Sequence, residues 1–256
     1  MSNFDYEVHY TGSKGNCVSI YTPSFNLMID AGKPYKYIEP HLYGIHFLIF
    51  SHRHSDHFKP AVYNKIRKNF PNIKILANET VNNLMIEKTK IPADVVFSDD
   101  FQFQIGNMKF TTIQNYHGEG EEFTDTHGVI IEDSETNEVL LYATDLSNML
   151  DYEDYLSKNS LQIDHCLLES NYDEEVIRFY ESTKAHFGYD IFSNGSYRHL
   201  SKKQHDEFIK NYCKPTATVL ELHKSDTYGT FEGLLRNTNG KISKEDLILW
   251  RKNGKY

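Results

Sequence analysis

The chain has 256 residues, of which 39% are hydrophobic and 14% aromatic, and its formal net charge is −9. This composition excludes a disordered chain, and no stretch approaches the roughly 20 apolar residues of a membrane-spanning helix. The acidic balance argues against a protein that grips long nucleic acid over much of its surface, because phosphate contacts require Lys and Arg.

Short strands alternate with helices along the chain, and no internal repeat or flexible linker divides it. In the first half we expect strands at 4–10, 17–22, 26–30, 45–51, 74–76, 101–105 and 108–113, with helices at 59–69 and 78–88. In the second half we expect a hairpin of strands 128–133 and 138–144, strands 164–169 and 217–222, and helices 146–157, 173–182 and 202–213. The pattern predicts a single domain, residues 1–256, in which two sheets pack face to face and helices cover them from outside.

The three cysteines, Cys17, Cys166 and Cys213, are far apart and lack Cys-x-x-Cys spacing. An odd number of isolated cysteines is typical of free thiols in a reducing compartment. We therefore expect a cytoplasmic protein without cysteine metal ligands. The first residues also do not resemble a signal peptide.

The most informative segment is the run from Ser51 to His57, which contains His52, His54, Asp56 and His57. It follows an apolar stretch that predicts a buried strand, and ligands that alternate just after a strand can converge on one point. Imidazole nitrogens suit zinc, and a carboxylate suits a second or harder ion. This pattern arises by chance in about two of a thousand chains of this composition, so we interpret the run as a metal site.

Three further candidate ligands, His117, Asp145 and His223, each follow an apolar strand, where sites on sheet scaffolds assemble. Each also has a simpler interpretation. Asp145 precedes the helix expected from Leu146 and is a candidate N-cap, and a lone His is often a surface residue. Seven other histidines have no matched role, and we expect them to be packing or surface residues: His9, His41, His46, His127, His165, His186 and His205.

The chain resembles the metallo-β-lactamase superfamily over nearly its whole length. The resemblance lies in the order of Asp30, His52-x-His54-x-Asp56-His57, His117, Asp145 and His223. The resemblance implies an α/β fold, an αββα sandwich, with two divalent metal ions at one sheet edge. It implies that His52, His54 and His117 hold one ion, that Asp56, His57 and His223 hold the other, and that Asp145 bridges them. It also implies that Asp30 orients a ligand imidazole. Zinc suits these ligands, and manganese is the alternative.

Finer motifs resemble the phosphodiesterase and nuclease branches of that superfamily. The segment from Thr11 to Cys17 is similar to the Gly-Ser-x-Gly-Asn-x opening of bacterial YycJ-type members. The segment from Ser196 to Ser201 is similar to their Gly-His-Leu-Ser turn, with Arg198 in place of the glycine. In the related transfer-RNA 3′-processing enzymes, a histidine in this turn helps to protonate the leaving oxygen with the support of an acidic residue. The resemblance gives these roles to His199 and Glu169, although His199 alone could be a capping-turn residue.

The expected chemistry is phosphodiester hydrolysis at two ions that clamp phosphoryl oxygens and acidify a water. In this scheme Asp56 receives a proton and His199 donates one. Three functions remain open: a phosphodiesterase for a small substrate, a YycJ-like or transfer-RNA-processing-like nuclease, and a binding protein with a degenerate site. The complete ligand set disfavours the last.

Three features favour a small nucleotide substrate over long nucleic acid. They are the acidic net charge, four acidic residues in the loop 118–125, and the lack of a basic arm. Phage anti-Pycsar phosphodiesterases of this branch hydrolyse cyclic mononucleotides. We therefore expect a cyclic-nucleotide phosphodiesterase, phage-encoded as one possibility and acting in the cytoplasm. We also expect a homodimer, as members of this branch commonly are, and no membrane partner.

Overall fold

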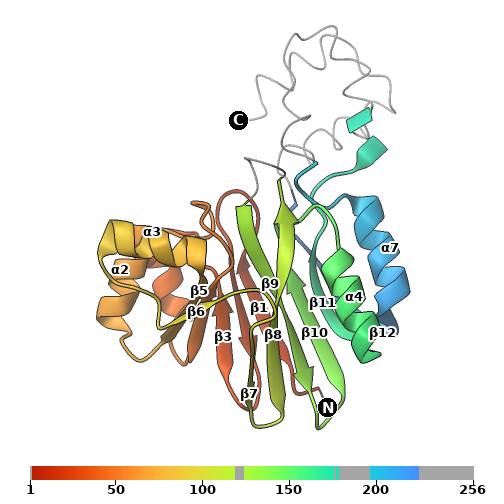
Figure 1. Ribbon diagram of the computed structural model, residues 1–256, viewed down its shortest axis with the longest axis horizontal. Helices are drawn as coiled ribbons and strands as arrows, with labels where there is room; N and C mark the ends of the chain where they lie inside the picture. The colour runs from red at the N-terminus through yellow and green to blue at the C-terminus, as the bar shows by residue number, and fades with distance from the viewer. Residues whose placement is uncertain (1, 119–123, 176, 179–196, 225–256) are drawn as a thin grey trace, which may run out of the picture.

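The computed structural model describes residues 2–118, 124–175, 177–178 and 197–224. These residues form two six-stranded sheets that face each other, with helices on both outer faces (Figure 1). The predicted αββα sandwich is therefore confirmed. No helix among the described residues is both long and apolar enough to cross a membrane.

The first sheet begins with an antiparallel meander and continues as parallel strands. Its strands, in spatial order, are β1 (Asp5–Tyr10), β2 (Cys17–Tyr21), β3 (Asn26–Ile29), β4 (Phe47–Phe50), β5 (Lys74–Asn78) and β6 (Val95–Phe97). Pairing is antiparallel from β1 to β3 and parallel from β3 to β6. The connections contain α1 (Tyr35–Ile38), a 3₁₀ helix (Glu39–His41), α2 (Pro60–Asn69) and α3 (Glu79–Thr89). Figure 1 shows α2 and α3 against the outer face.

The second sheet has the same plan, with antiparallel pairing first and parallel pairing toward its last strand. Its strands are β7 (Gln102–Ile105), β8 (Met108–His117), β9 (Thr124–Asp133), β10 (Glu138–Ala143), β11 (Ile163–Glu169) and β12 (Cys213–Leu222). Pairing is antiparallel from β7 to β10 and parallel from β10 to β12. The outer face is covered by α4 (Leu150–Asn159) and α7 (Lys202–Tyr212) (Figure 1).

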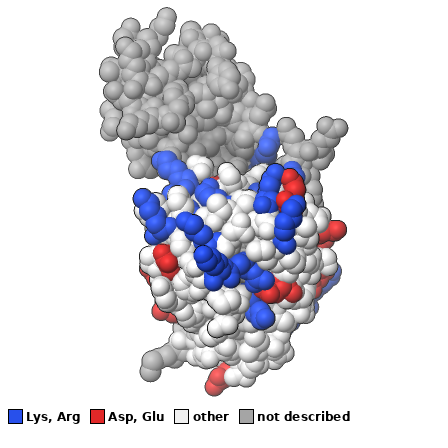
Figure 2. All heavy atoms as spheres, turned by 90° about the vertical axis from the view of Figure 1, so that its left-hand side faces the viewer, with Lys and Arg blue, Asp and Glu red and all other residues white. Residues whose placement is uncertain are grey.

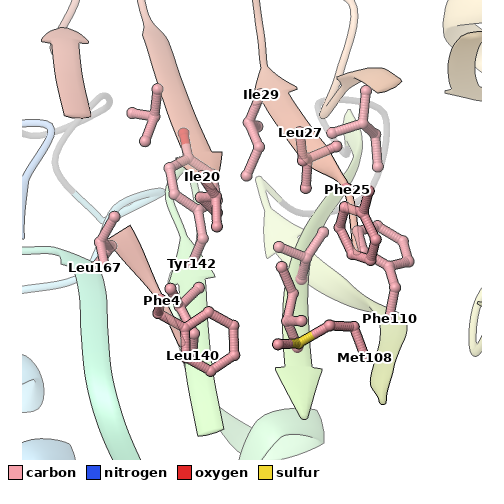
Figure 3. Close-up of a cluster of buried hydrophobic side chains, with 14 of the residues drawn as sticks. Phe4, Ile20, Phe25, Leu27, Ile29, Met108, Phe110, Leu140, Tyr142 and Leu167 are labelled. Carbon is pink, nitrogen blue, oxygen red and sulfur yellow. The ribbon is translucent and has the colours of Figure 1, made fainter. Parts of the chain in front are cut away.

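Alternation along the central strands produces three apolar layers. In β3, Leu27 and Ile29 face the second sheet, whereas Met28 faces the helices outside, because successive side chains of a strand point to opposite faces. Figure 3 shows Leu27 and Ile29 together with Leu140 and Tyr142 of β10 in the layer between the sheets. Burying each such side chain contributes about 1.5–3 kcal/mol, so the two sheets are held together mainly by this layer.

Strand direction gathers the polar strand ends at one edge of the sandwich. The parallel pair β3 and β4 ends there in the first sheet, and β10, β11 and β12 end together in the second. Strand β8 runs in the same direction as β10, because each is antiparallel to β9. Residues that directly follow these strands therefore meet at one rim.

Several predicted boundaries were wrong for local reasons. The helix expected from Leu146 begins at Leu150, the short strand β6 was not predicted, and β12 begins at Cys213 although Pro215 follows. Proline is tolerated in β12 because that strand lies at a sheet edge. Ser201 and Gln204 form a capping box at the start of α7. Of the helix expected at 173–182, residues 174, 175, 177 and 178 are helical, and the rest lies outside the described residues.

Candidate metal centre

The rim brings together every residue for which the sequence predicted a role in metal binding or catalysis. Six imidazoles and four carboxylates meet there: His52, His54, His57, His117, His199 and His223, with Asp30, Asp56, Asp145 and Glu169. They come from the ends of six strands, β3 and β4 in the first sheet and β8, β10, β11 and β12 in the second, except His199, which lies in the turn before α7. Most are buried, but 23% of the Asp56 side chain and 18% of the His199 side chain remain exposed. These two groups are therefore placed to meet solvent or a substrate.

The backbone is strained where three of the strands reach this rim. Asp30, Asp145 and His223 have φ of 63°, 59° and 51°, in the left-handed region that side chains with a Cβ rarely adopt. Such residues cost on the order of 1–3 kcal/mol each and persist only where surrounding structure fixes them. Here the strain turns each side chain sharply from its strand into the cluster.

One group of imidazoles consists of His52, His54 and His117, whose ligand atoms lie close enough to share one metal ion. His52 Nε2 lies 3.0 Å from His54 Nδ1. His117 Nδ1 donates a hydrogen bond to the Arg198 carbonyl oxygen at 3.1 Å, which leaves its Nε2 as the free lone pair. The acceptor of this hydrogen bond is a backbone oxygen. The bond is therefore compatible with arginine at position 198, where the Gly-His-Leu-Ser turn of YycJ-type members has glycine.

A second group consists of Asp56, His57 and His223, which also satisfies the spacing of a metal site. His57 Nε2 lies 3.5 Å and His223 Nε2 lies 3.8 Å from Asp56 Oδ2. Two ligands of a tetrahedral zinc ion are about 3.4 Å apart, given bonds of 2.0–2.1 Å. The Asn16 amide donates to His57 Nε2 at 2.8 Å, and an ion on His57 would replace this bond.

Asp145 lies between the two groups and directs one oxygen toward each. Its Oδ1 is 3.9 Å from His117 Nε2, whereas its Oδ2 is 3.1 Å from His57 Nε2 and 3.7 Å from His223 Nε2. The N-cap alternative for Asp145 is wrong, since α4 begins five residues later, at Leu150, with Met149 as its N-cap. The carboxylate thus has the position of a bridge.

Unsatisfied buried atoms show that the donor set fits metal ions. Four buried side-chain atoms of the described residues have no hydrogen-bond partner, and two of them, Asp145 Oδ2 and His223 Nε2, lie at the rim. Buried polar groups are nearly always hydrogen-bonded, because leaving one unpaired costs on the order of 1–3 kcal/mol. Both atoms are good metal donors, and both face the same space between the groups.

A second layer of hydrogen bonds orients the imidazoles. Asp30 Oδ2 accepts from His57 Nδ1 at 2.6 Å and from the Ser51 hydroxyl at 2.8 Å, while Asp30 Oδ1 accepts from the Ser51 amide. This matches the orienting role that the resemblance implied for Asp30. The Ser51 contribution could not be anticipated, because a serine before the histidine run has no distinctive spacing.

The Thr11–Cys17 segment supports the loop of the histidine run from below. Asn16 donates from its backbone to the Asp56 carbonyl oxygen at 2.7 Å, and Gly32 donates to the Asn16 carbonyl oxygen at 3.0 Å. A Cβ on Gly32 would lie 1.6 Å from the Asp56 carbonyl oxygen, so only glycine fits. The motif therefore positions Asp56 and His57 through backbone contacts.

Glu169 pairs with His199 as expected and also with a residue that was not expected. Its Oε1 accepts from His199 Nδ1 at 2.6 Å and from His223 Nδ1 at 3.0 Å. Its Oε2 accepts from the Leu146 amide at 3.1 Å. This buried carboxylate orients both imidazoles and leaves the Nε2 atoms directed away from it.

The two groups differ in charge. Burial holds the pKa values of His52, His54 and His117 below the ordinary value, so all three are neutral ligands near pH 7. Burial also lowers the pKa of His223, but Asp145, Asp56 and Glu169 outweigh it and raise that pKa to about 10. An ion bound by His223 must therefore displace a proton.

The pH dependence of folding in the metal-free protein should report the charge on Glu169. Burial raises the pKa of Glu169, but His199 and His223 outweigh it and lower the pKa from 4.5 to about 2. The carboxylate therefore stabilises the fold above about pH 4.5, and this contribution, on the order of 3 kcal/mol, is lost as the pH falls toward 2. Urea unfolding of the wild type and Glu169→Gln should differ by that amount at pH 6 and converge near pH 2. A difference that stays constant with pH would contradict this.

Solved structures with the same architecture carry the metallo-β-lactamase fold. The metallo-β-lactamase fold protein YhfI from Bacillus subtilis is 15% identical, with a TM-score of 0.59 over 86% of this chain and 85% of that one. A diphosphatase from the PhnP family is 15% identical, with a TM-score of 0.58 over 86% of each chain. Unliganded yeast PDE1 is 11% identical, with a TM-score of 0.63 over 93% of this chain and 95% of that one. No family model and no curated protein sequence matches the chain. The chain therefore has the metallo-β-lactamase fold, and its activity must be argued from the site.

Proposed function

We propose that this protein is a metal-dependent phosphodiesterase with two divalent ions. The observation that carries the proposal is Asp145, whose two oxygens face two separate groups of imidazoles. His52, His54 and His117 would hold one ion, and Asp56, His57 and His223 the other. The likeness in fold to a PhnP-family diphosphatase supports phosphoester chemistry without establishing it.

When bound, such ions neutralise phosphoryl oxygens and lower the pKa of a coordinated water. The chain's own residues then supply proton transfer. Asp56 is the most exposed carboxylate of the cluster, and burial raises its pKa while the imidazoles of His223 and His57 lower it below the ordinary value. An ionised Asp56 can accept a proton from the attacking water.

His199 is placed as the proton donor. Burial lowers its pKa, but Glu169 outweighs this and leaves the pKa above the ordinary value, so the imidazole holds its proton more readily than a free imidazole does. Glu169 holds Nδ1, and the partly exposed ring can present Nε2–H to a leaving oxygen. General acids of this kind contribute about 10²–10⁴-fold in rate.

For the substrate, we propose a small phosphodiester such as a cyclic mononucleotide. The second sheet and its connections support this, because residues 99–175 contain nineteen Asp and Glu and two Lys. That side of the rim would repel a long polyanion. Glu119, Glu121 and Glu122 of the acidic loop after His117 lie outside the described residues, but Asp125 is described and accepts from the Thr80 hydroxyl at 2.7 Å.

A nuclease is the second candidate, and one observation favours it. Residues 31–94 contain ten Lys and Arg and five Asp and Glu, against the trend of the whole chain. We define the basic face as the exposed cations of this stretch: Lys36, Arg53, Lys65, Lys68, Lys74, Lys88 and Lys90. Figure 2 looks onto the side that carries α2 and α3 and shows Lys and Arg gathered there. Arg53 lies between two ligands of the rim, so the basic face reaches the metal centre.

A substrate panel separates the two candidates. Metal-loaded protein is incubated with cyclic AMP, cyclic CMP and cyclic UMP, and in parallel with single-stranded DNA and structured RNA. Turnover of a cyclic nucleotide is expected. Cleavage of polymer without cyclic-nucleotide turnover would contradict the small-substrate proposal and support the nuclease.

Charge reversal on α2 provides an independent check. In the double variant Lys65→Glu/Lys68→Glu, cyclic-nucleotide turnover should be unchanged, because a single phosphate contacts the rim and not the helix. If the substrate is a polymer, its KM should rise and the salt dependence of binding should weaken by about 0.7 per lost phosphate contact. Lys158→Glu on α4, where the side chain is 71% exposed, is the matched control. An effect half as large in Lys158→Glu, which reverses one charge where the double variant reverses two, would show that only net charge matters.

Zinc is the proposed metal, because five of the seven proposed ligands are histidines, and manganese is the alternative. The homodimer and the cytoplasmic location stay predictions.

A further inference from the structure

A second cluster of metal-ligating side chains lies outside the rim, on the outer face of the first sheet. Glu7 and His9 are two residues apart on β1, and His41 comes from the 3₁₀ helix that precedes β4. The pairing of β1 with β2 shifts register between Val8 and Tyr10, so His9 occupies a bulge. Bulges re-aim side chains, and this one places His9 beneath His41.

The His9 side chain is 1% exposed, yet one of its ring nitrogens has no hydrogen bond. Its Nε2 is paired with the Ser19 hydroxyl at 2.9 Å, so the unpaired atom is Nδ1. That atom lies 3.4 Å from Glu7 Oε1. A buried nitrogen with its partner ring atom already fixed is the arrangement that orients metal-binding histidines.

We propose that Glu7, His9 and His41 bind a divalent transition-metal ion of the zinc class. Their ligand atoms all lie within 4.8 Å of one another. The separation of 3.4 Å between Glu7 Oε1 and His9 Nδ1 equals the span of about 3.4 Å that two ligands make around a tetrahedral ion. Glu7 is 63% exposed, so water can complete the coordination.

The His41 ring changes its orientation when the ion binds. Without metal, the His9 and His41 rings stack at 3.7 Å with an interplanar angle of 24°. An ion must lie near the plane of each imidazole, so His41 has to turn about its terminal torsion, which is broad and inexpensive. His41 is only half-buried and has room to do so. Burial and the neighbouring His41 hold the pKa of His9 below its ordinary value, which keeps the ring neutral and able to ligate.

The ion would tie β1 to the connection between β3 and β4. Directly after β1, the Thr11 hydroxyl accepts a hydrogen bond from the His223 backbone amide at 2.7 Å. The cluster thus holds the strand that leads into the metal centre, although it shares no residue with that centre. Histidines of this cluster had been expected to be packing or surface residues, and the geometry assigns two of them a role.

Metal content tests this proposal independently of activity. Wild-type protein and the variants Glu7→Gln and His41→Ala are stripped with chelator, reloaded with excess Zn²⁺, desalted, and measured for zinc per chain. Both variants should hold one ion fewer than the wild type, with unchanged phosphodiester turnover. Asp5→Asn is the matched control, because Asp5 is an exposed carboxylate two residues before Glu7 on the same face of β1, and it should retain the wild-type zinc content.

Equal zinc content in wild type, Glu7→Gln and His41→Ala would overturn the proposal. If the rim failed to bind metal, the zinc content of the wild type and of the three variants would fall equally. The difference in zinc content between the wild type and the two cluster variants would remain. Replacement of Zn²⁺ by Cu²⁺ gives a second readout, since nitrogen hyperfine coupling in the electron paramagnetic resonance spectrum should change in His41→Ala and not in Asp5→Asn. An unchanged spectrum in His41→Ala would also contradict the assignment.

Discussion

Replacing Asp145 with alanine is expected to lower phosphodiester turnover by about 10³-fold or more. The reason is that this carboxylate faces both groups of imidazoles, with Oδ1 toward His117 and Oδ2 toward His57 and His223. In the metal-free protein, its removal also leaves the buried His223, whose pKa is raised to about 10, without its main counter-charge. Turnover and bound metal should therefore fall together.

The variant Asp154→Ala is the control, because its carboxylate is 61% exposed on α4 and pairs only with Lys158 among the contacts that the structure shows. It should keep wild-type turnover and metal content. Circular dichroism is used to check that Asp145→Ala folds. A folded Asp145→Ala protein with full activity would contradict the bridging role.

Replacing His199 with alanine should slow hydrolysis of a phosphodiester with an alkoxide leaving group by about 10²–10⁴-fold. The imidazole is held by Glu169 and is partly exposed, as a proton donor to a leaving oxygen must be. Metal content should stay near the wild-type value, since the proposed ligand set does not include His199.

The leaving group separates acid catalysis from a structural effect. A p-nitrophenolate leaves without protonation, so hydrolysis of bis(p-nitrophenyl) phosphate by His199→Ala should be nearly as fast as by the wild type. His46→Ala, at an exposed histidine just before β4 and so at the end of that strand away from the rim, controls for loss of an imidazole. An equal loss of rate on both substrates would show that His199 supports the fold of the site instead.

Most of the rim could be predicted from the sequence because its ligands directly follow apolar strands. Strand-terminal position is visible in the sequence for His52, His117, Asp145 and His223, and the sandwich then brings the strand ends together. The assignment within the cluster came from the resemblance, and the spacing of the ligand atoms is compatible with those two groups as well as with other, overlapping ones.

Contacts that depend on how strands pair in three dimensions could not be predicted from the sequence. The shared acceptor role of Glu169 requires β11 and β12 to end side by side, which no local pattern encodes. The cluster around His9 depends on a bulge and a short 3₁₀ helix, two features without a clear periodicity. The start of α4 at Leu150 was also missed, since the strained turn at Asp145 delays the helix.

The distribution of charge was hidden by the average. A net charge of −9 combines a basic stretch at residues 31–94 with an acidic one at 99–175. The basic stretch belongs to the first sheet and the acidic stretch mainly to the second, so they lie on opposite sides of the rim. A substrate at the rim would therefore meet a basic surface, seen in Figure 2, on one side and an acidic surface on the other. The net charge of the whole chain therefore favours a small substrate more strongly than the distribution of charge in the structure does.

The central claim is that two ions at the rim act together in phosphodiester hydrolysis. The most direct test is a zinc titration of metal-stripped Glu7→Gln protein, in which the cluster outside the rim does not compete, with bound zinc and hydrolysis of bis(p-nitrophenyl) phosphate followed together. Turnover should rise mainly as the second equivalent of zinc binds and should reach its plateau at two zinc ions per chain. Full turnover at one ion per chain, or turnover that persists in the stripped protein under chelator, would contradict the central claim.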